Sequence, residues 1–265
     1  MRILAISDLH VDYDENRRWL YELPRHEYSD DILILAGDIS HETGLLAEAL
    51  AELGQRFRAV VFTPGNHDLW VYQNHAADSL ARFEQVRQIT LDCGVQMEPL
   101  VLDEVAIIPL LGWYDFSFGE PSAEVRRAWM DFTACRWPDG MDPPAVTRCF
   151  TAMNEPYLQV NRPTVITFSH FLPRIDLMPL IIPPHRQGLY PVLGSRLLEE
   201  QLRRAGASVH VYGHSHINMR NFKEGVLYLN NALGYPHETR TARQLVCVWE
   251  KQRAENYRQT GPERG

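Results

Sequence analysis

The chain has 265 residues, of which 45% are hydrophobic, so it can bury a sizeable core within one large domain. Its formal net charge is -8, which argues against a nucleic-acid partner, because nucleic-acid-binding surfaces are usually basic. No stretch reaches the eighteen or so apolar residues of a membrane helix, and the apolar run 3–6 is too short for a signal peptide. We therefore expect a cytoplasmic protein without a membrane partner.

The amino-terminal half alternates strand-like apolar runs with helical segments. Strands are predicted at residues 2–7, 31–36 and 59–63. Between them, segment 41–57 places its leucines on one side, as an amphipathic helix does, and a second helix is predicted at about 75–92. Strands joined by helical crossovers imply a parallel, right-handed arrangement.

The rest of the chain contains further strand-like runs, predicted at residues 105–110, 164–168, 208–212, 226–230 and 245–249. Periodicity therefore indicates a large α/β domain, and we treat residues 1–265 as that single domain. Two segments, at about 112–163 and 171–194, look like insertions between strands.

Short polar motifs follow five of these apolar runs, at the point where each strand should end. They are Asp8-Leu9-His10, Gly37-Asp38, Gly65-Asn66-His67-Asp68, Ser169-His170 and Gly213-His214-Ser215-His216. Open α/β sheets bind ligands beyond the carboxyl ends of their strands, so we expect these motifs to converge on one crevice.

The residue types in these motifs are metal ligands. Alternate residues of an extended segment point the same way, so Asp8 with His10, and His214 with His216, can each present two ligands together. A carboxylate, an amide oxygen and an imidazole are added by Asp38, Asn66 and His170. Oxygen and nitrogen donors suit Mn, Fe, Zn, Co or Ni, whereas a calcium site would contain few histidines.

Seven ligands are too many for one tetrahedral zinc, but they fit two ions that share a bridging carboxylate. Two metals about 3.5–4 Å apart can convert a bridging water into hydroxide near neutral pH and clamp the oxygens of an in-line displacement. Hydrolysis of a phosphate ester through such a metal-bridging hydroxide is the natural use of this centre.

The ordered series of motifs resembles the calcineurin-like metallophosphoesterases, from residue 2 to beyond Gly213. In that family, one metal is held by the residues that match Asp8, His10, Asp38 and His216. The other is held by the residues that match Asp38, Asn66, His170 and His214. The resemblance implies two ions, most often Mn, Fe or Zn, and a four-layer α/β/β/α sandwich of two stacked sheets flanked by helices.

The resemblance also implies individual roles. Asp38 would bridge the two metals, and Asn66 would help to stabilise the charge that develops during the reaction. His67 matches the family's general acid or phosphate-contacting histidine, and Asp68 matches its orienting carboxylate. A carboxylate behind His67 would hold the ring and favour its protonated form.

Each motif also has an ordinary structural interpretation. The pair Gly65-Asn66 is typical of a tight turn, and His170 is typical of a histidine at the end of a strand. The Gly-His-Ser-His motif that begins at Gly213 also suits a solvated loop. The order and strand context of all five motifs together favour the metal centre over these separate interpretations.

The two insertions are expected to lie near the site and to set specificity. Aromatic residues in 112–163 either line a substrate pocket or pack a helical insertion. In the proline-rich segment 171–194, Arg174, His185 and Arg186 either bind a phosphate or remain solvated surface charges. His41 is a further candidate for substrate binding, with a solvated position at a helix start as its alternative.

Departures from relatives narrow the substrate to a phosphodiester or a small phosphomonoester. Asp38 is followed by Ile39-Ser40-His41-Glu42-Thr43, which lacks the Val-Asp-Arg-Gly continuation of the serine/threonine protein phosphatases. UDP-diacylglucosamine hydrolases carry arginine at the position of His67, so the sequence also disfavours that activity. The remaining alternatives are a scaffold of the same fold that acts in protein interaction, with or without metal, and a nuclease. The sequence sets no oligomeric state.

Overall fold

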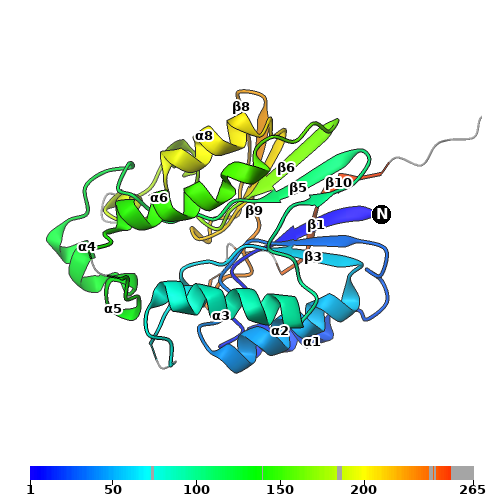
Figure 1. Ribbon diagram of the computed structural model, residues 1–265, viewed down its shortest axis with the longest axis horizontal. Helices are drawn as coiled ribbons and strands as arrows, with labels where there is room; N and C mark the ends of the chain where they lie inside the picture. Colours follow the sequence, from blue (N-terminus) through cyan, green and yellow to red (C-terminus); the bar gives the residue numbers. More distant parts are fainter. Residues whose placement is uncertain (73–74, 139, 184–186, 239–240, 242, 252–265) are drawn as a thin grey trace, which may run out of the picture.

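The computed structural model describes residues 1–72, 75–138, 140–183, 187–238, 241 and 243–251. In these residues two β-sheets pack face to face, and helices cover the outer face of each sheet (Figure 1). The strand order is β10-β1-β2-β3 in the first sheet and β4-β5-β6-β7-β9-β8 in the second. The prediction of a four-layer α/β/β/α sandwich is therefore confirmed.

The first sheet comes mostly from the amino-terminal third of the chain. Its strands are β1 (Arg2–Ile6), β2 (Ile32–Leu35), β3 (Ala59–Phe62) and β10 (Val246–Glu250). The strands β1, β2 and β3 are parallel, and β10 is antiparallel to β1. Its outer face is covered by α1 (Asp14–Glu22), α2 (Thr43–Arg56) and α3 (Ser79–Asp92) (Figure 1).

The second sheet is larger and also mostly parallel. Its strands are β4 (Leu100–Val101), β5 (Val105–Pro109), β6 (Thr164–Phe168), β7 (Val209–Tyr212), β8 (Arg220–Lys223) and β9 (Val226–Asn230). The edge strands β4 and β8 are antiparallel to their neighbours, whereas β5, β6, β7 and β9 run parallel. The helices α6 (Pro143–Asn154) and α8 (Arg196–Arg204) cover its outer face (Figure 1).

Alternate side chains of the central strands enter different layers of the core. In β1, Ile3 and Ala5 pack between the two sheets, whereas Leu4 and Ile6 pack against the helices of the first sheet. In β5, Ile107 faces the first sheet and Ile108 faces the outer helices. Burial on both faces explains why these strands are continuous apolar runs rather than alternating ones.

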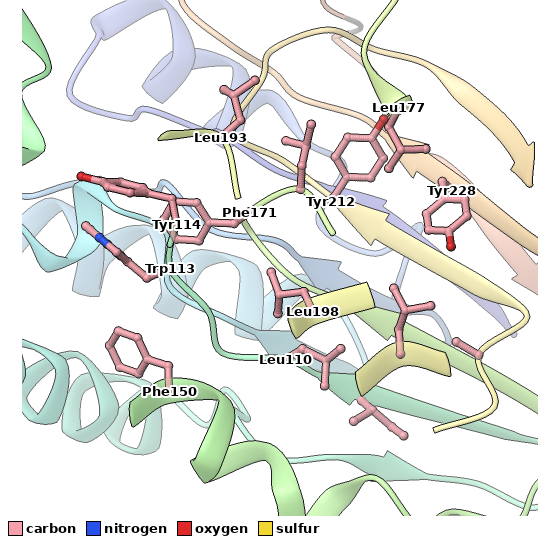
Figure 2. Packing of buried hydrophobic residues seen from close by; sticks show 14 of the residues in the cluster. Leu110, Trp113, Tyr114, Phe150, Phe171, Leu177, Leu193, Leu198, Tyr212 and Tyr228 are labelled. Carbon is pink, nitrogen blue, oxygen red and sulfur yellow. The ribbon is translucent and has the colours of Figure 1, made fainter. Parts of the chain in front are cut away.

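The segment 112–163 forms part of the helical layer and one end of the sandwich. Its elements are α4 (Ala123–Ala128), α5 (Asp131–Ala134), α6 and the 3-10 turn η2 (Glu155–Tyr157). Figure 2 shows Trp113, Tyr114 and Phe150 packed with Phe171 in the core outside the second sheet. Trp113 is fully buried, with its ring centroid 5.1 Å from that of Phe171, so most of these aromatic residues pack a helical insertion.

Among the elements that the structure describes in full, the others are short 3-10 turns: η1 (His67–Leu69), η3 (Ile175–Leu177) and η4 (Tyr190–Val192). The turn η1 directly follows Asn66, and η3 and η4 lie within segment 171–194. In the ranges that the structure describes, no helix is both long enough and apolar enough to span a bilayer.

Candidate metal centre

Loops from both sheets bring all seven predicted ligands into one cluster. The loops after β1, β2 and β3 carry Asp8, His10, Asp38 and Asn66. The loops after β6 and β7 carry His170, His214 and His216. We call these residues the seven-residue cluster. Its members converge because the carboxyl ends of the parallel strands of both sheets meet at the same edge of the sandwich.

Three members form a first group, consisting of Asp8, His10 and His216. The Nε2 atom of His216 lies 3.1 Å from Asp8 Oδ1 and 3.2 Å from His10 Nε2. These atoms are close enough for one ion to contact all three.

The second group contains Asp38, Asn66, His170 and His214. The Nε2 atom of His170 lies 3.3 Å from Asp38 Oδ2, 3.1 Å from Asn66 Oδ1 and 3.1 Å from His214 Nδ1. Asp38 Oδ2 is also 3.9 Å from His10 Nε2, which belongs to the first group. The carboxylate of Asp38 therefore lies between the two groups.

The backbone at the cluster adopts an unusual conformation. Five members have positive φ angles: Asp8 (54°), His10 (43°), Asp38 (57°), His214 (67°) and His216 (49°). Each such residue costs on the order of 1–3 kcal/mol, and strain of this kind concentrates at functional sites. The expectation that the paired ligands lie on extended segments is therefore wrong, because they occupy left-handed turns beyond the strand ends.

Two glycines in the motifs are required by close packing against carboxylates. A Cβ atom on Gly65 would lie 2.1 Å from Asp38 Oδ1. A Cβ atom on Gly213 would lie 2.7 Å from Asp8 Oδ2. Both distances are far below van der Waals contact. The carboxylates of Asp38 and Asp8 therefore fit only because glycine, which has no side chain, occupies positions 65 and 213.

The outer nitrogens of three histidines are held by oxygen acceptors. His170 Nδ1 lies 2.9 Å from the carbonyl of Ala36, His214 Nε2 lies 3.0 Å from the carbonyl of Val192, and His216 Nδ1 lies 2.7 Å from Glu238 Oε2. Since these oxygens only accept, the outer nitrogens donate and the inner nitrogens face the cluster. His170 Nε2 and His214 Nδ1 therefore face each other at 3.1 Å, which needs a proton or a metal ion between them.

The electrostatics of the cluster also favour bound cations. Burial lowers the pKa of His214 to about 3, so this ring is neutral and its lone pair is available. Burial opposes ionisation of Asp8, but the charge of His216 lowers its pKa to about 2. Burial disfavours a charge on His170 as well, yet Asp38 raises its pKa to about 9. The ionised carboxylates thus attract a positive charge. Either a proton on a histidine or a metal ion between the ligand atoms can supply that charge, so the two compete.

The donor set therefore fits transition-metal ions, and comparison with known proteins identifies the family. The profile of the calcineurin-like phosphoesterases matches residues 1–218, which include the whole seven-residue cluster. The chain belongs to the calcineurin-like phosphoesterase family. It is a hydrolase of phosphate esters, and members of this family use divalent metal ions.

Two comparisons show how far the similarity extends. The chain is 27% identical over 281 residues to [acyl-carrier-protein] phosphodiesterase PptH of Mycobacterium tuberculosis, covering 94% of this chain and 82% of that protein. The crystal structure of phosphopantetheinyl hydrolase (PptH) from Mycobacterium tuberculosis superposes with a TM-score of 0.76 at 24% identity. That superposition covers 89% of this chain and 90% of the other, so the fold is shared almost throughout.

In this phosphoesterase, His67 lies beside the cluster and is partly accessible. Its Nε2 atom is 4.0 Å from Asp38 Oδ2, and its side chain is 16% exposed. Its backbone nitrogen donates to Asp38 Oδ1 at 2.9 Å, and its ring stacks on Trp70 with centroids 3.8 Å apart. The ring of His67 is thus held by an indole face.

Asp68 makes contacts that differ from the expected one with the ring of His67. Its Oδ2 atom accepts from the backbone nitrogens of Gly65 at 2.8 Å and Asp38 at 2.9 Å. Its Oδ1 atom accepts from the backbone nitrogens of Ile39 at 2.8 Å and Ser40 at 3.1 Å. This buried carboxylate therefore joins the two turns that carry Asp38 and Asn66.

The described residues that were predicted to bind substrate make contacts with residues outside the seven-residue cluster. The guanidinium of Arg174 forms ion pairs with Asp176, Glu199 and Glu224 at 2.7–3.3 Å, and none of these belongs to the cluster. His41 Nδ1 lies 3.4 Å from Asp12 Oδ1. The other two predicted residues, His185 and Arg186, lie outside the described residues.

Several contacts at the cluster were not predicted from the sequence. The ring of Tyr235 stacks on His10 with centroids 4.5 Å apart, and Glu238 holds His216. Asp131 accepts a hydrogen bond from Asn66 Nδ2 at 2.9 Å. These residues lie in loops or short helices without a recognisable motif. The only signal near Asp131 is its position among the aromatic residues of segment 112–163.

A cleft of about 850 Å³ opens beside the cluster, next to His214 and His216. Segment 171–194 also lines this cleft, through Met178, Pro179, Ile181, Ile182, Pro183, Leu189 and Leu193. Trp129 also lines the cleft, so one aromatic residue of the other segment reaches it. The described residues of this segment that line the cleft are all apolar.

Proposed function

We propose that this chain is a phosphodiesterase that uses two metal ions. One ion would be held by Asp8, His10, Asp38 and His216. The other would be held by Asp38, Asn66, His170 and His214. The observation that carries the proposal is that seven donors form two neighbouring groups and that the carboxylate of Asp38 lies between them. When bound, such ions supply an activated water nucleophile and positive charge for the phosphate oxygens.

The chain's own residues have separate tasks in this proposal. Asn66 and the histidines of the second group hold the phosphate-binding side of the centre. His67 donates a proton to the leaving oxygen, and the indole of Trp70 keeps its ring in place for that step. Asp68 keeps the turns of Asp38 and Asn66 in register through its backbone hydrogen bonds.

The cleft beside His214 and His216 supports a diester over a small monoester. A diester carries a group on each side of the phosphate, and the cleft offers about 850 Å³ for one of them. Its mainly apolar wall suits an elongated arm. Because the similar protein PptH is named as an acyl-carrier-protein phosphodiesterase, a carrier protein with a phosphopantetheinyl arm is the substrate that we propose to test first.

The decisive experiment incubates the full chain and Mn²⁺ with an acyl carrier protein that bears this arm, and measures the intact mass of the carrier protein. We expect loss of the arm with the wild-type chain and none with Asp38→Asn. Turnover of bis(4-nitrophenyl) phosphate is expected to exceed that of 4-nitrophenyl phosphate. A carrier protein of unchanged mass would refute the proposed substrate. Faster hydrolysis of the monoester would refute the preference for diesters. Faster hydrolysis of DNA would refute the proposed substrate class. Fewer than two bound ions per chain would refute the dinuclear centre.

A further inference from the structure

Asp131 is a buried carboxylate that receives three side-chain hydrogen bonds next to the seven-residue cluster. It is 3% exposed and begins the short helix α5. Its Oδ1 atom accepts from Asn66 Nδ2 at 2.9 Å and from Trp70 Nε1 at 2.7 Å. Its Oδ2 atom accepts from Trp129 Nε1 at 2.7 Å. These three donors are side chains outside α5, so these bonds are not a cap of that helix.

The contact with Asn66 determines how its amide group is turned. Both oxygens of Asp131 accept hydrogen bonds from indole nitrogens, and Asn66 turns its NH₂ group toward Asp131 as a further donor. The amide oxygen must then point the other way, where Oδ1 lies 3.1 Å from His170 Nε2. With the amide reversed, Asn66 would present hydrogens to the cluster and could not act as a ligand.

The same carboxylate holds two indole rings that contact histidines. Trp70 stacks on His67 with centroids 3.8 Å apart and planes 27° from parallel. Trp129 meets His214 edge to face, with centroids 5.7 Å apart. Both indole nitrogens donate to Asp131. A shift of the Asp131 side chain would therefore move both indoles and change their contacts with His67 and His214.

We propose that Asp131 is a positioning residue of the metal centre. It holds the amide of Asn66 with its oxygen toward the ion of the second group, and it fixes the indoles that support His67 and His214. This inference rests on the proposed function, because it takes Asn66 to be a metal ligand. The group of Asp8, His10 and His216 has no contact with Asp131 among the hydrogen bonds of the described residues, so its ion should be unaffected.

The test compares Asp131→Asn with Asp142→Asn in the full chain. Asp142 lies in the same segment, is exposed, and accepts from the backbone nitrogen of Ala145 at 2.8 Å, away from the cluster. The metal-free proteins are titrated with Mn²⁺ by calorimetry. We expect Asp131→Asn to weaken one of the two binding steps by about 10–100-fold and to leave the other unchanged. Asp142→Asn should bind both ions as the wild type does.

A second variant separates orientation from packing. In the double variant Asn66→Asp with Asp131→Asn, the amide and the carboxylate exchange places, so the amide again donates across the contact and an oxygen again faces the ion. Trp70 Nε1 then loses its acceptor, because it donates to the same oxygen of Asp131 as Asn66 does. We expect this exchange to restore part of the lost affinity, because the oxygen again faces the ion while the Trp70 hydrogen bond stays broken, and it keeps the experiment decisive if Asp131→Asn alone fails to fold. Tryptophan emission should shift in the single variant because Trp70 and Trp129 lose a charged acceptor.

The outcomes distinguish this inference from the proposed function. The positioning role would be overturned if Asp131→Asn bound both ions with wild-type affinity. It would also be overturned if both affinities fell equally. Failure of the exchange to restore affinity would overturn it as well. A wild-type chain that binds fewer than two ions would instead defeat the proposed function, whatever Asp131 does.

Discussion

The residue whose replacement should best separate metal binding from catalysis is His67. Its side chain is 16% exposed, and its ring nitrogen Nε2 lies 4.0 Å from Asp38 Oδ2. We expect His67→Ala to lower kcat by about 10²–10⁴-fold while both ions stay bound, because general acid catalysis contributes this much. The loss should grow as the leaving group becomes more basic. A series of aryl phosphodiesters with leaving groups of increasing pKa measures this dependence.

The matched control for His67 is the exposed His26, which lies before β2. Its replacement by alanine should leave kcat unchanged for every ester of the series. If His67→Ala lowered turnover equally for good and poor leaving groups, proton donation would be the wrong role, and a contact with the phosphate would explain the loss better.

Gly65 provides a prediction about how tightly the cluster is built. In Gly65→Ala the new Cβ atom would lie 2.1 Å from Asp38 Oδ1, so the carboxylate between the two groups must move. We expect a large loss of bound metal, measured by elemental analysis of the purified protein, and a matching loss of turnover.

Gly44→Ala is the control for this steric argument. Gly44 lies in α2 with nothing within 4 Å of an added Cβ atom, so the change should preserve metal content. It should raise the free energy of unfolding by about 0.5–1 kcal/mol, because alanine favours helix over glycine. A Gly65→Ala protein with normal metal content would contradict the close approach to Asp38.

The seven residues of the cluster could be predicted together, because each is a polar residue in a short motif directly after an apolar run. Asp131 could not be predicted in this way, since its partner Asn66 lies 65 residues away and no local pattern links the two. Asp68 was expected at the site, but its four backbone partners could not be predicted, because they depend on how two loops meet. Motifs therefore predict which residues converge in the cluster, whereas the residues that hold them in place depend on tertiary packing.

Among the elements, segment 171–194 should determine which diesters are bound. Ile181 lines the cleft and is 92% exposed, so its replacement should not affect the fold. We expect Ile181→Ser to raise KM several-fold for a substrate with a long apolar arm, because burial of such a side chain contributes about 1.5–3 kcal/mol at most. KM for a small aryl diester should be unchanged. Steady-state kinetics with the two substrates measures the difference.

Leu91→Ser is the matched change on another surface. Leu91 is 62% exposed on α3 and does not line the cleft, so neither KM should respond. An equal rise of KM for both substrates in Ile181→Ser would show that this segment acts on the metal centre rather than on the arm.

The elements that could be predicted are those with apolar runs. Each predicted strand is found within one or two residues of its expected bounds, as β1, β6 and β9 illustrate. The edge strand β8 was not predicted, because its sequence Arg-Asn-Phe-Lys is polar and depends on pairing with β9. Helix α1 was also missed, since its nine residues are mostly charged and only two of them are buried.

At the scale of the molecule, the division of the strands into two sheets could not be read from periodicity. β1 and β5 are similar apolar runs, yet they belong to different sheets. Only the resemblance to a known family implied two stacked sheets. The division matters for function, because each group of the cluster takes ligands from loops of both sheets.

Metal removal should therefore weaken the whole fold as well as stop catalysis. In the first group Asp8 and His10 follow a strand of one sheet and His216 follows a strand of the other, so an ion bound there joins the two sheets. Each ion should stabilise the native state by about 2.7 kcal/mol when free metal is a hundredfold above its Kd. Urea unfolding with Mn²⁺ or with a chelator measures the difference. Asp38→Asn should lose most of this stabilisation, and an equal gain in both proteins would place the ions elsewhere.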